Sequence, residues 1–220
     1  MTDDDRTAGF LRMLDDLHAR HLVGVADVRE VWLIRHADAY GDMESLAAGI
    51  VDPPLSERGR EQAARLAARL AAVPLHAVWS SRLRRAAETA EAVARGHGLT
   101  VRTDDRLREV RTYWDEGREA ERAAPGTYPF PEPEEEVVAR MRAVFADVVA
   151  GLAAVDAPVP RAAVVTHNGT IAMYLSSVLG LRWGQLRVLP QFTSVSVVAV
   201  KGDQVVVQSI ADATHLSPAR

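Results

Sequence analysis

Short apolar segments alternate with helical segments along this chain, and that alternation restricts the fold more than any other feature. Buried strands are expected at about 30–35, 77–79, 99–103, 162–166, 194–200 and 204–210. Apolar residues at helical spacing predict intervening helices at about 56–72, 83–95, 134–155 and 170–179. Strands separated by helices form mostly parallel sheets covered on both faces. We therefore expect a three-layer α/β/α sandwich, with an antiparallel edge strand supplied by the last hairpin.

Length, charge and cysteine content exclude several classes of protein. The chain has 220 residues, enough for one α/β domain with a full core. Its net charge of −4 gives no bulk attraction to nucleic acid or to a membrane surface. It has no cysteine, no apolar run long enough to span a membrane, and an acidic rather than basic start. We expect a cytoplasmic protein without nucleic-acid or membrane partners.

Residues 1–30 precede the first strand and are expected to form an N-terminal extension. Phe10, Leu11, Leu14 and Leu17 recur at helical spacing there. The predicted helix would pack on the domain without a function of its own, or mediate formation of a homodimer. Residues 31–213 are expected to form a single domain. Within it, 111–136 is rich in proline, glycine and charged residues, which predicts an irregular lid.

Polar residues follow three of the expected strands at the point where each strand ends. Arg35-His36 follows Val31–Ile34, Ser80 to Arg85 follows the second strand, and His167-Asn168 follows 162–166. Ligands of parallel α/β sheets bind beyond the carboxyl ends of the strands. The sequence therefore predicts that these three segments meet at one edge of the sheet.

Two arginines and two histidines at such an edge suit phosphoryl transfer. Arg35 and Arg85 can grip phosphate oxygens and spread the charge of the transition state. The imidazole of His36 can attack phosphorus and form a phosphohistidine. His167 can donate hydrogen bonds to the phosphoryl oxygens.

The same chemistry needs a carboxylic acid to protonate the leaving alkoxide and then to activate water. Glu109, in a loop after the third strand, is the candidate. The backbone N–H groups of Asn168 and Gly169, at the start of a helix, can add contacts to the anion. Taken singly, Arg35-His36 would be a solvated pair, His167 a core histidine and Glu109 a surface acid. Their expected clustering favours a site.

Five segments together resemble the histidine phosphatase superfamily, which includes the cofactor-dependent phosphoglycerate mutases. They occur in the family's order and spacing, at residues 33–37, 54–63, 80–90, 107–109 and 165–169. The resemblance implies a phosphoglycerate mutase-like fold with no metal and no cofactor. It also implies roles: His36 accepts the phosphoryl group, Arg35 and Arg85 clamp it, His167 is the second pocket histidine, and Glu109 is the acid and base.

Two departures from the family bear on function. Ala37 stands where the family commonly has glycine, and its methyl group is expected to narrow the pocket floor. The segment after Glu109 follows the family pattern only loosely, so Asp115 and Glu116 are alternative acids. It is also too short to hold the substrate-clamping segment typical of phosphoglycerate mutases.

A mutase must retain its bisphosphate intermediate, so this short segment favours a phosphatase. We therefore predict a phosphomonoester hydrolase that acts on a small phosphorylated metabolite. The alternatives are a bisphosphate-dependent phosphoglycerate mutase and a non-catalytic phosphate-binding module.

Overall fold

The computed structural model of the chain describes residues 3–39, 52–111 and 130–217, which form one six-stranded sheet and the helices around it. The strands are β1 (Arg29–Arg35), β2 (Ala77–Ser80), β3 (Val101–Thr103), β4 (Arg161–Thr166), β5 (Val195–Lys201) and β6 (Gln204–Asp212). The helices are α1 (Asp3–His21), α3 (Glu57–Leu70), α4 (Arg84–His97), α5 (Glu134–Gly151) and α6 (Asn168–Val178). Two short 3-10 turns, η1 (Asp105–Leu107) and η2 (Thr214–Leu216), complete the described elements.

The sheet is mixed, with the strand order β3-β2-β4-β1-β5-β6. The four strands from β3 to β1 are parallel, whereas β5 is antiparallel to both β1 and β6. The expected α/β fold and the terminal hairpin are confirmed. The reversed strand, however, is β5, one position in from the edge. The edge strand β6 is antiparallel to β5 and therefore runs in the same direction as β1.

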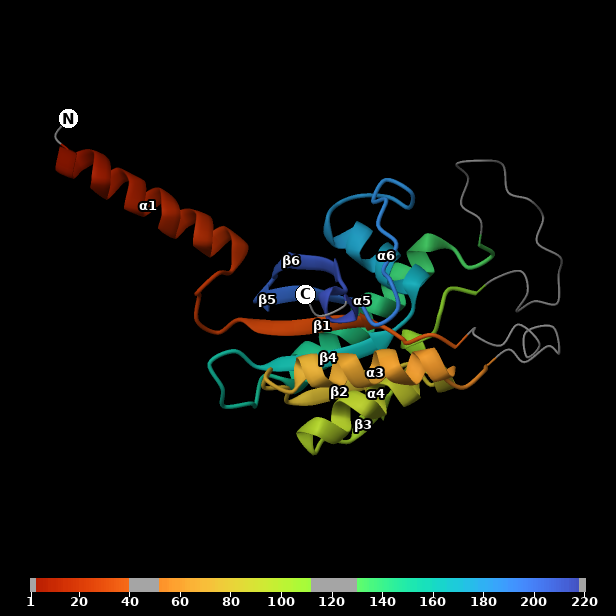
Figure 1. Ribbon diagram of the computed structural model, residues 1–220. Coiled ribbons are helices and arrows are strands. Elements are labelled where there is room, and N and C mark those ends of the chain that lie inside the picture. The colour runs from red at the N-terminus through yellow and green to blue at the C-terminus, as the bar shows by residue number, and fades with distance from the viewer. Residues whose placement is uncertain (1–2, 40–51, 112–129, 218–220) are drawn as a thin grey trace.

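Two helical layers cover the sheet, and β1 contributes to the core on both sides (Figure 1). Leu33 packs with Met141 of α5 and Ile171 of α6, whereas Ile34 packs with Leu66 of α3 and Val93 of α4. Successive side chains of a strand point to opposite faces, so neighbouring residues serve different layers. This two-sided burial explains why β1 is apolar throughout its centre.

Helix boundaries follow local chemistry. Ser56 caps α3, and its hydroxyl accepts the N–H of Gly59 at 3.0 Å. α5 begins at Glu134, so the segment expected to be irregular over 111–136 ends at Pro133. α6 begins at Asn168, two residues before the expected start, and Gly180 follows its end with a φ of +69°. The centre of the predicted lid, 112–129, lies outside the described residues.

The N-terminal extension forms α1, which stands away from the sheet and its helices (Figure 1). It joins the body through Leu22 and Val28, which are buried against Ala199 of β5. Of the helices in the described part of the chain, none has the length and apolar character needed to cross a membrane.

Candidate active site

The residues expected to carry chemistry lie at the carboxyl ends of β1, β2 and β4. Backbone hydrogen bonds continue past the strands and hold these ends together. The N–H of His36 donates to the carbonyl of Thr166 at 2.9 Å, and the N–H of Ser81 donates to that of Val165 at 3.0 Å. α4 then begins at Arg84, so its first turn carries Arg85 back to His36. Three separate stretches of sequence are therefore fixed at one place by the sheet itself.

His36 is almost fully buried, at 2 % exposure, and its hydrogen bonds define its tautomer. Nδ1 lies 2.7 Å from the carbonyl oxygen of Ala37, which can only accept, so Nδ1 carries the hydrogen. Nε2 therefore has the lone pair, and it accepts the Nε–H of Arg85 at 3.3 Å. Burial and the charges of Arg85 and Arg35 outweigh the Ala37 hydrogen bond and lower the pKa of His36 to about 3. At neutral pH the imidazole is an uncharged nucleophile.

Two guanidinium groups lie beside this imidazole. Arg35 donates from Nη1 to the carbonyl of Pro190 at 2.8 Å, and its guanidinium carbon lies 4.0 Å from the ring centroid of Phe192. Arg85 is buried, and its Nη1 lies 3.5 Å from a carboxylate oxygen of Asp52. Permanent positive charges of this kind provide a strong field for an oxyanion.

His167 completes the group from the end of β4. It is fully buried, and its ring centroid lies 5.1 Å from that of His36. Neither ring nitrogen has a hydrogen-bond partner among the described residues, and the same holds for the buried Oδ1 of Asn168. Buried polar atoms are rarely left without partners, so these atoms are suited to bind a ligand. Burial, with the nearby His36 and arginines, sets the pKa of His167 well below its usual value.

Glu109 is held at the amino end of α6, directly beyond His167. Its Oε1 accepts the backbone N–H of Val110 at 2.9 Å and that of Thr170 at 3.1 Å, and the Thr170 hydroxyl at 3.2 Å. Its Oε2 accepts the N–H of Gly169 at 3.4 Å. Free N–H groups and the helix dipole favour an anion here. The Gly169 N–H is directed to Glu109 in this structure, and its contact with a substrate anion stays a prediction.

A buried ion-pair network supports the Glu109 segment. Glu132 has a fully buried side chain that accepts both Nη atoms of Arg108 at 2.7 Å, the Nε of Arg140 at 3.0 Å and the N–H of Arg111 at 2.8 Å. Arg140 also donates to the carbonyls of Arg106 at 2.6 Å and Arg108 at 2.9 Å. Burial opposes ionisation of Glu132, but these hydrogen bonds outweigh it and lower its pKa to about 2. This network was not predicted from the sequence.

A second set of contacts, also missed from sequence, fixes the loop after His36. The hydroxyl of Thr89 accepts the N–H of Ala37 at 3.0 Å, and the amide oxygen of Gln62 accepts that of Asp38 at 2.9 Å. Ala37 itself is fully buried against Leu55 and Ala63. Its methyl group therefore packs in the core, and the expectation that it narrows the pocket floor is wrong. Thr89 lies one helical turn after Arg85 on α4. The sequence could therefore have indicated that Thr89 shares the face of the helix that carries Arg85.

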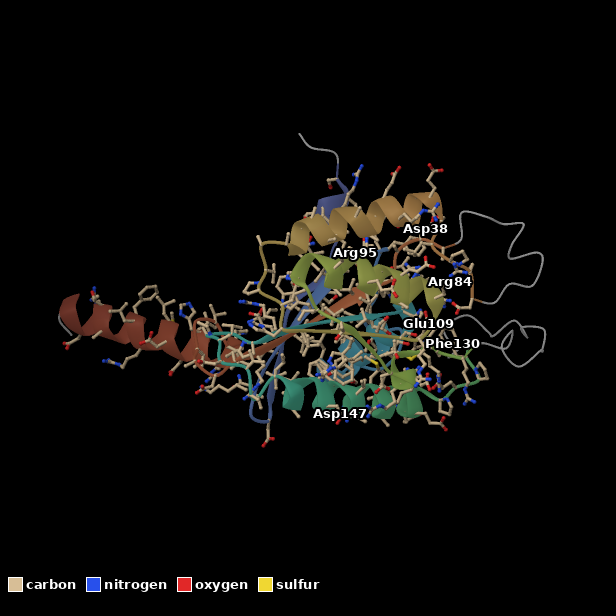
Figure 2. The ribbon with its side chains drawn as sticks, turned by 90° about the horizontal axis from the view of Figure 1, so that it is seen from below. Asp38, Arg84, Arg95, Glu109, Phe130 and Asp147 are labelled. Carbon is tan, nitrogen blue, oxygen red and sulfur yellow. The ribbon has the colours of Figure 1, made fainter. Side chains whose placement is uncertain are left out.

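Side chains from several elements lie at this end of the molecule, as Figure 2 shows for Asp38, Arg84, Glu109 and Phe130. The alternative acids Asp115 and Glu116 lie outside the described residues. In the ranges 3–39, 52–111 and 130–217, no three or more histidine or acidic side chains are grouped so that they could hold a metal ion.

Comparison with known proteins decides the family. A profile of the histidine phosphatase superfamily (branch 1) matches residues 31–213. The chain belongs to the histidine phosphatase superfamily. The resemblance in the five sequence segments is thereby confirmed.

Among its relatives, a probable phosphoglycerate mutase of Cronobacter sakazakii is 31 % identical to this histidine phosphatase over 168 residues, 69 % of this chain and 75 % of that protein. A mycobacterial glucosyl-3-phosphoglycerate phosphatase is 26 % identical, with a TM-score of 0.67 over 83 % of this chain and 98 % of that one. The protein YhfR of Bacillus stearothermophilus is 25 % identical, with a TM-score of 0.69 over 86 % and 100 %. These relatives carry both mutase and phosphatase names.

Proposed function

We propose that this histidine phosphatase hydrolyses phosphomonoesters through a phosphohistidine on His36. The observation that carries the proposal is the state of that imidazole: buried, uncharged, and with its lone pair on Nε2 beside Arg85. A neutral imidazole among fixed positive charges is a nucleophile placed where an anionic phosphate would bind. The unpartnered nitrogens of His167 support the same position for the phosphoryl oxygens.

In the first step, Nε2 of His36 attacks phosphorus and the bond to the leaving oxygen breaks. The Nε–H of Arg85 exchanges its contact with Nε2 for one with the phosphoryl oxygens, where the guanidinium opposes the growing negative charge. Glu109, in its protonated form, gives its proton to the leaving alkoxide. The developing positive charge on His36 is shared with the Ala37 carbonyl through Nδ1–H.

In the second step, water attacks the phosphohistidine. Glu109, now a carboxylate, removes a proton from that water, and the electron pair of the N–P bond returns to Nε2. Inorganic phosphate leaves, and His36 is again neutral. The hydrogen bonds from Val110, Gly169 and Thr170 hold the carboxyl group of Glu109 in place through both steps.

The substrate we propose is a small phosphorylated metabolite, and the cysteine-free sequence suits a reducing cytoplasm. The names of the relatives suggest the first compounds to assay. The names given above suggest glucosyl-3-phosphoglycerate and a phosphoglycerate. Phosphoserine is a third compound, because a phosphoserine phosphatase of Hydrogenobacter thermophilus is 38 % identical over 78 residues, 36 % of this chain and 37 % of that protein. Phosphate release from each, against p-nitrophenyl phosphate, would rank them.

A mutase is the second candidate, favoured by the name of the Cronobacter sakazakii relative. It would return the phosphoryl group from His36 to a second hydroxyl instead of to water. This activity predicts isomerised 3-phosphoglycerate and dependence on a bisphosphate primer. Product analysis with and without primer distinguishes it from hydrolysis, which yields only free phosphate.

The decisive experiment compares His36→Ala with wild type on p-nitrophenyl phosphate. Loss of the nucleophile should lower kcat by ~10³-fold or more. His18→Ala, an exposed histidine on α1, is the matched control and should retain full activity. Activity should also persist in a chelator. Full turnover by His36→Ala would refute the phosphohistidine, and no turnover by wild type on any phosphomonoester would favour a non-catalytic binding module.

A further inference from the structure

Helix α1 exposes an apolar stripe that the rest of the described chain leaves uncovered. Phe10 is 55 % exposed, Met13 55 % and Leu17 47 %, and Leu14 lies between them on the same side. The positions i, i+3, i+4 and i+7 are the anchors that a helix uses to bind an apolar groove. Most of the stability of a helix in a protein comes from packing of its apolar face, so burial of the stripe would stabilise α1.

The root of α1 is clamped so that the helix points away from its own domain (Figure 1). The side chain of Gln204 donates to the carbonyl of Arg20 at 2.8 Å. Leu22 and Val28, just after the helix, are buried against Ala199. Folding α1 back onto its own domain would break this clamp, so another molecule is better placed to cover the stripe.

An apolar groove lies at the same end of the sheet as that root. A cavity of about 560 Å³ separates α5 and α6 from the β5–β6 hairpin, and its walls are largely apolar, with Phe145, Val149, Tyr174, Val178 and Val205 among them. Val200 and Val205 line the groove, whereas their neighbours Ala199 and Val206 contact the root of α1, so groove and root lie on opposite faces of the hairpin. In the sheet register, Val200 of the groove pairs with Arg29, the first residue of β1. Helix root and groove thus share the amino end of β1, opposite to the candidate active site.

We propose that two copies of this chain form a dimer by exchanging α1, each helix lying in the other copy's groove. Each chain carries both the helix and the groove at the same end of the sheet. Two copies related by a two-fold axis can therefore form the same helix–groove contact twice, and no helix or groove is left to bind a third copy. The amino end of α1 begins Asp3-Asp4-Asp5, which is complementary in sign to Arg142 at the groove. With five aspartates against three arginines, α1 lacks the basic face of membrane-surface helices.

Engineered cysteines test this arrangement directly, because the chain has none of its own. Leu14→Cys on one chain and Val178→Cys on another are mixed and oxidised. A disulfide-linked dimer containing one of each is the expected product on a non-reducing gel. Leu14→Cys mixed with Leu189→Cys is the matched control, since Leu189 is 70 % exposed and lies outside both surfaces.

Other outcomes of this experiment would overturn the proposal. A Leu14→Cys/Val178→Cys double variant that cross-links only within one chain would show that α1 covers its own groove. Cross-linking confined to Leu14→Cys with itself would show a helix pair instead of a groove. A wild-type chain that sediments as a monomer would exclude every form of the dimer.

Charge substitutions provide a second readout. Phe10→Asp/Leu17→Asp and, separately, Val205→Asp should each weaken the dimer about tenfold or more by equilibrium sedimentation. Mixing these two variants should restore dimers, because one intact helix still meets one intact groove. Circular dichroism checks that each variant is folded. A Val205→Asp variant that dimerises like wild type would contradict the role of the groove.

Discussion

His36 and Glu109 are fixed in place by different kinds of contact. His36 follows a buried strand, and the backbone of neighbouring strands and the side chains of α3 and α4 hold its loop. Glu109 lies in a loop and is held by hydrogen bonds from the amino end of α6 and by the Glu132 network behind it. The position of the nucleophile thus depends on the strands and apolar core, whereas the position of the acid depends on hydrogen bonds and ion pairs.

Two glycines show the same contrast. A methyl group at Gly59 would overlap the backbone oxygen of Asp38, which cannot move without shifting the loop after His36. A methyl group at Gly169 would lie 3.0 Å from Oε1 of Glu109 and from a methyl carbon of Val110, which are side-chain atoms. Near His36 the close contact is therefore with a backbone atom, whereas near Glu109 it is with side-chain atoms.

The largest effect is expected from Glu109→Gln, which keeps the shape but removes the proton. kcat should fall by about 10²- to 10⁴-fold, the usual contribution of a general acid. The loss should be greatest for alkyl phosphates and smaller for p-nitrophenyl phosphate, whose leaving group needs little protonation. Asp115→Asn and Glu116→Gln are the controls. Should one of them show this leaving-group dependence while Glu109→Gln does not, the acid is assigned to that residue.

Glu132→Gln should test whether the acid depends on its polar support. The variant leaves the charge of Arg140 buried without its carboxylate, which should lower the free energy of unfolding by about 3–5 kcal/mol. Because Arg140 holds the carbonyls on either side of Leu107, kcat should fall as well, with little change in phosphate affinity. Glu136→Gln, whose side chain is 61 % exposed and pairs with Arg111 at 3.7 Å, should change neither. Equal stability of both variants would show that the network does not support the loop.

The buried state of His36 predicts a pH dependence of stability. A pKa of about 3 in the folded chain, against 6.5 when unfolded, means that the unfolded chain binds more protons between these values. Stability therefore falls as the pH drops below 6.5, by about 2 kcal/mol between pH 7 and 5 for this one group. Urea unfolding of His36→Asn should show a correspondingly smaller loss, with His18→Asn behaving as wild type. Identical pH profiles would show that His36 is not held neutral by the fold.

The smallest effect is expected from Gly59→Ala, compared with Gly169→Ala. Alanine favours helix over glycine, but the clash with Asp38 should leave a net loss of about 1–2 kcal/mol in the free energy of unfolding. Gly169→Ala should cost less stability while lowering kcat, because Glu109 can move aside. Gly96→Ala in α4, with nothing within 4 Å of the added methyl group, is the control and should be neutral or stabilising. A larger loss of stability for Gly169→Ala than for Gly59→Ala would contradict this difference between the two sites.

The difference between the strand-end residues and the polar contacts also explains which site residues could be predicted from the sequence. Arg35, His36 and His167 were found because each follows an apolar strand, and parallel strands bring such ends together. The positions of Glu132, Arg140 and Phe192 carry no periodic signal. Glu132 contacts Arg108 across 24 residues, and Arg35 meets the carbonyl of Pro190 across 155. Contacts of this kind depend on the finished fold, so only coordinates reveal them. The direction of β5 was missed for a related reason, because apolar alternation marks a strand without giving its orientation.

Glu132 also joins two parts of the chain that are about 20 residues apart in sequence. Its carboxylate accepts hydrogen bonds from the backbone N–H of Arg111 and from both Nη atoms of Arg108. The carboxylate therefore acts as a non-covalent cross-link between the backbone beside Glu109 and the residues that lead into α5. Closing a loop has an entropic cost that grows only slowly with its length, by about 0.6 kcal/mol for each doubling. The hydrogen bonds and ion pairs at Glu132 are placed to offset that cost, so Glu109 stays anchored at the amino end of α6.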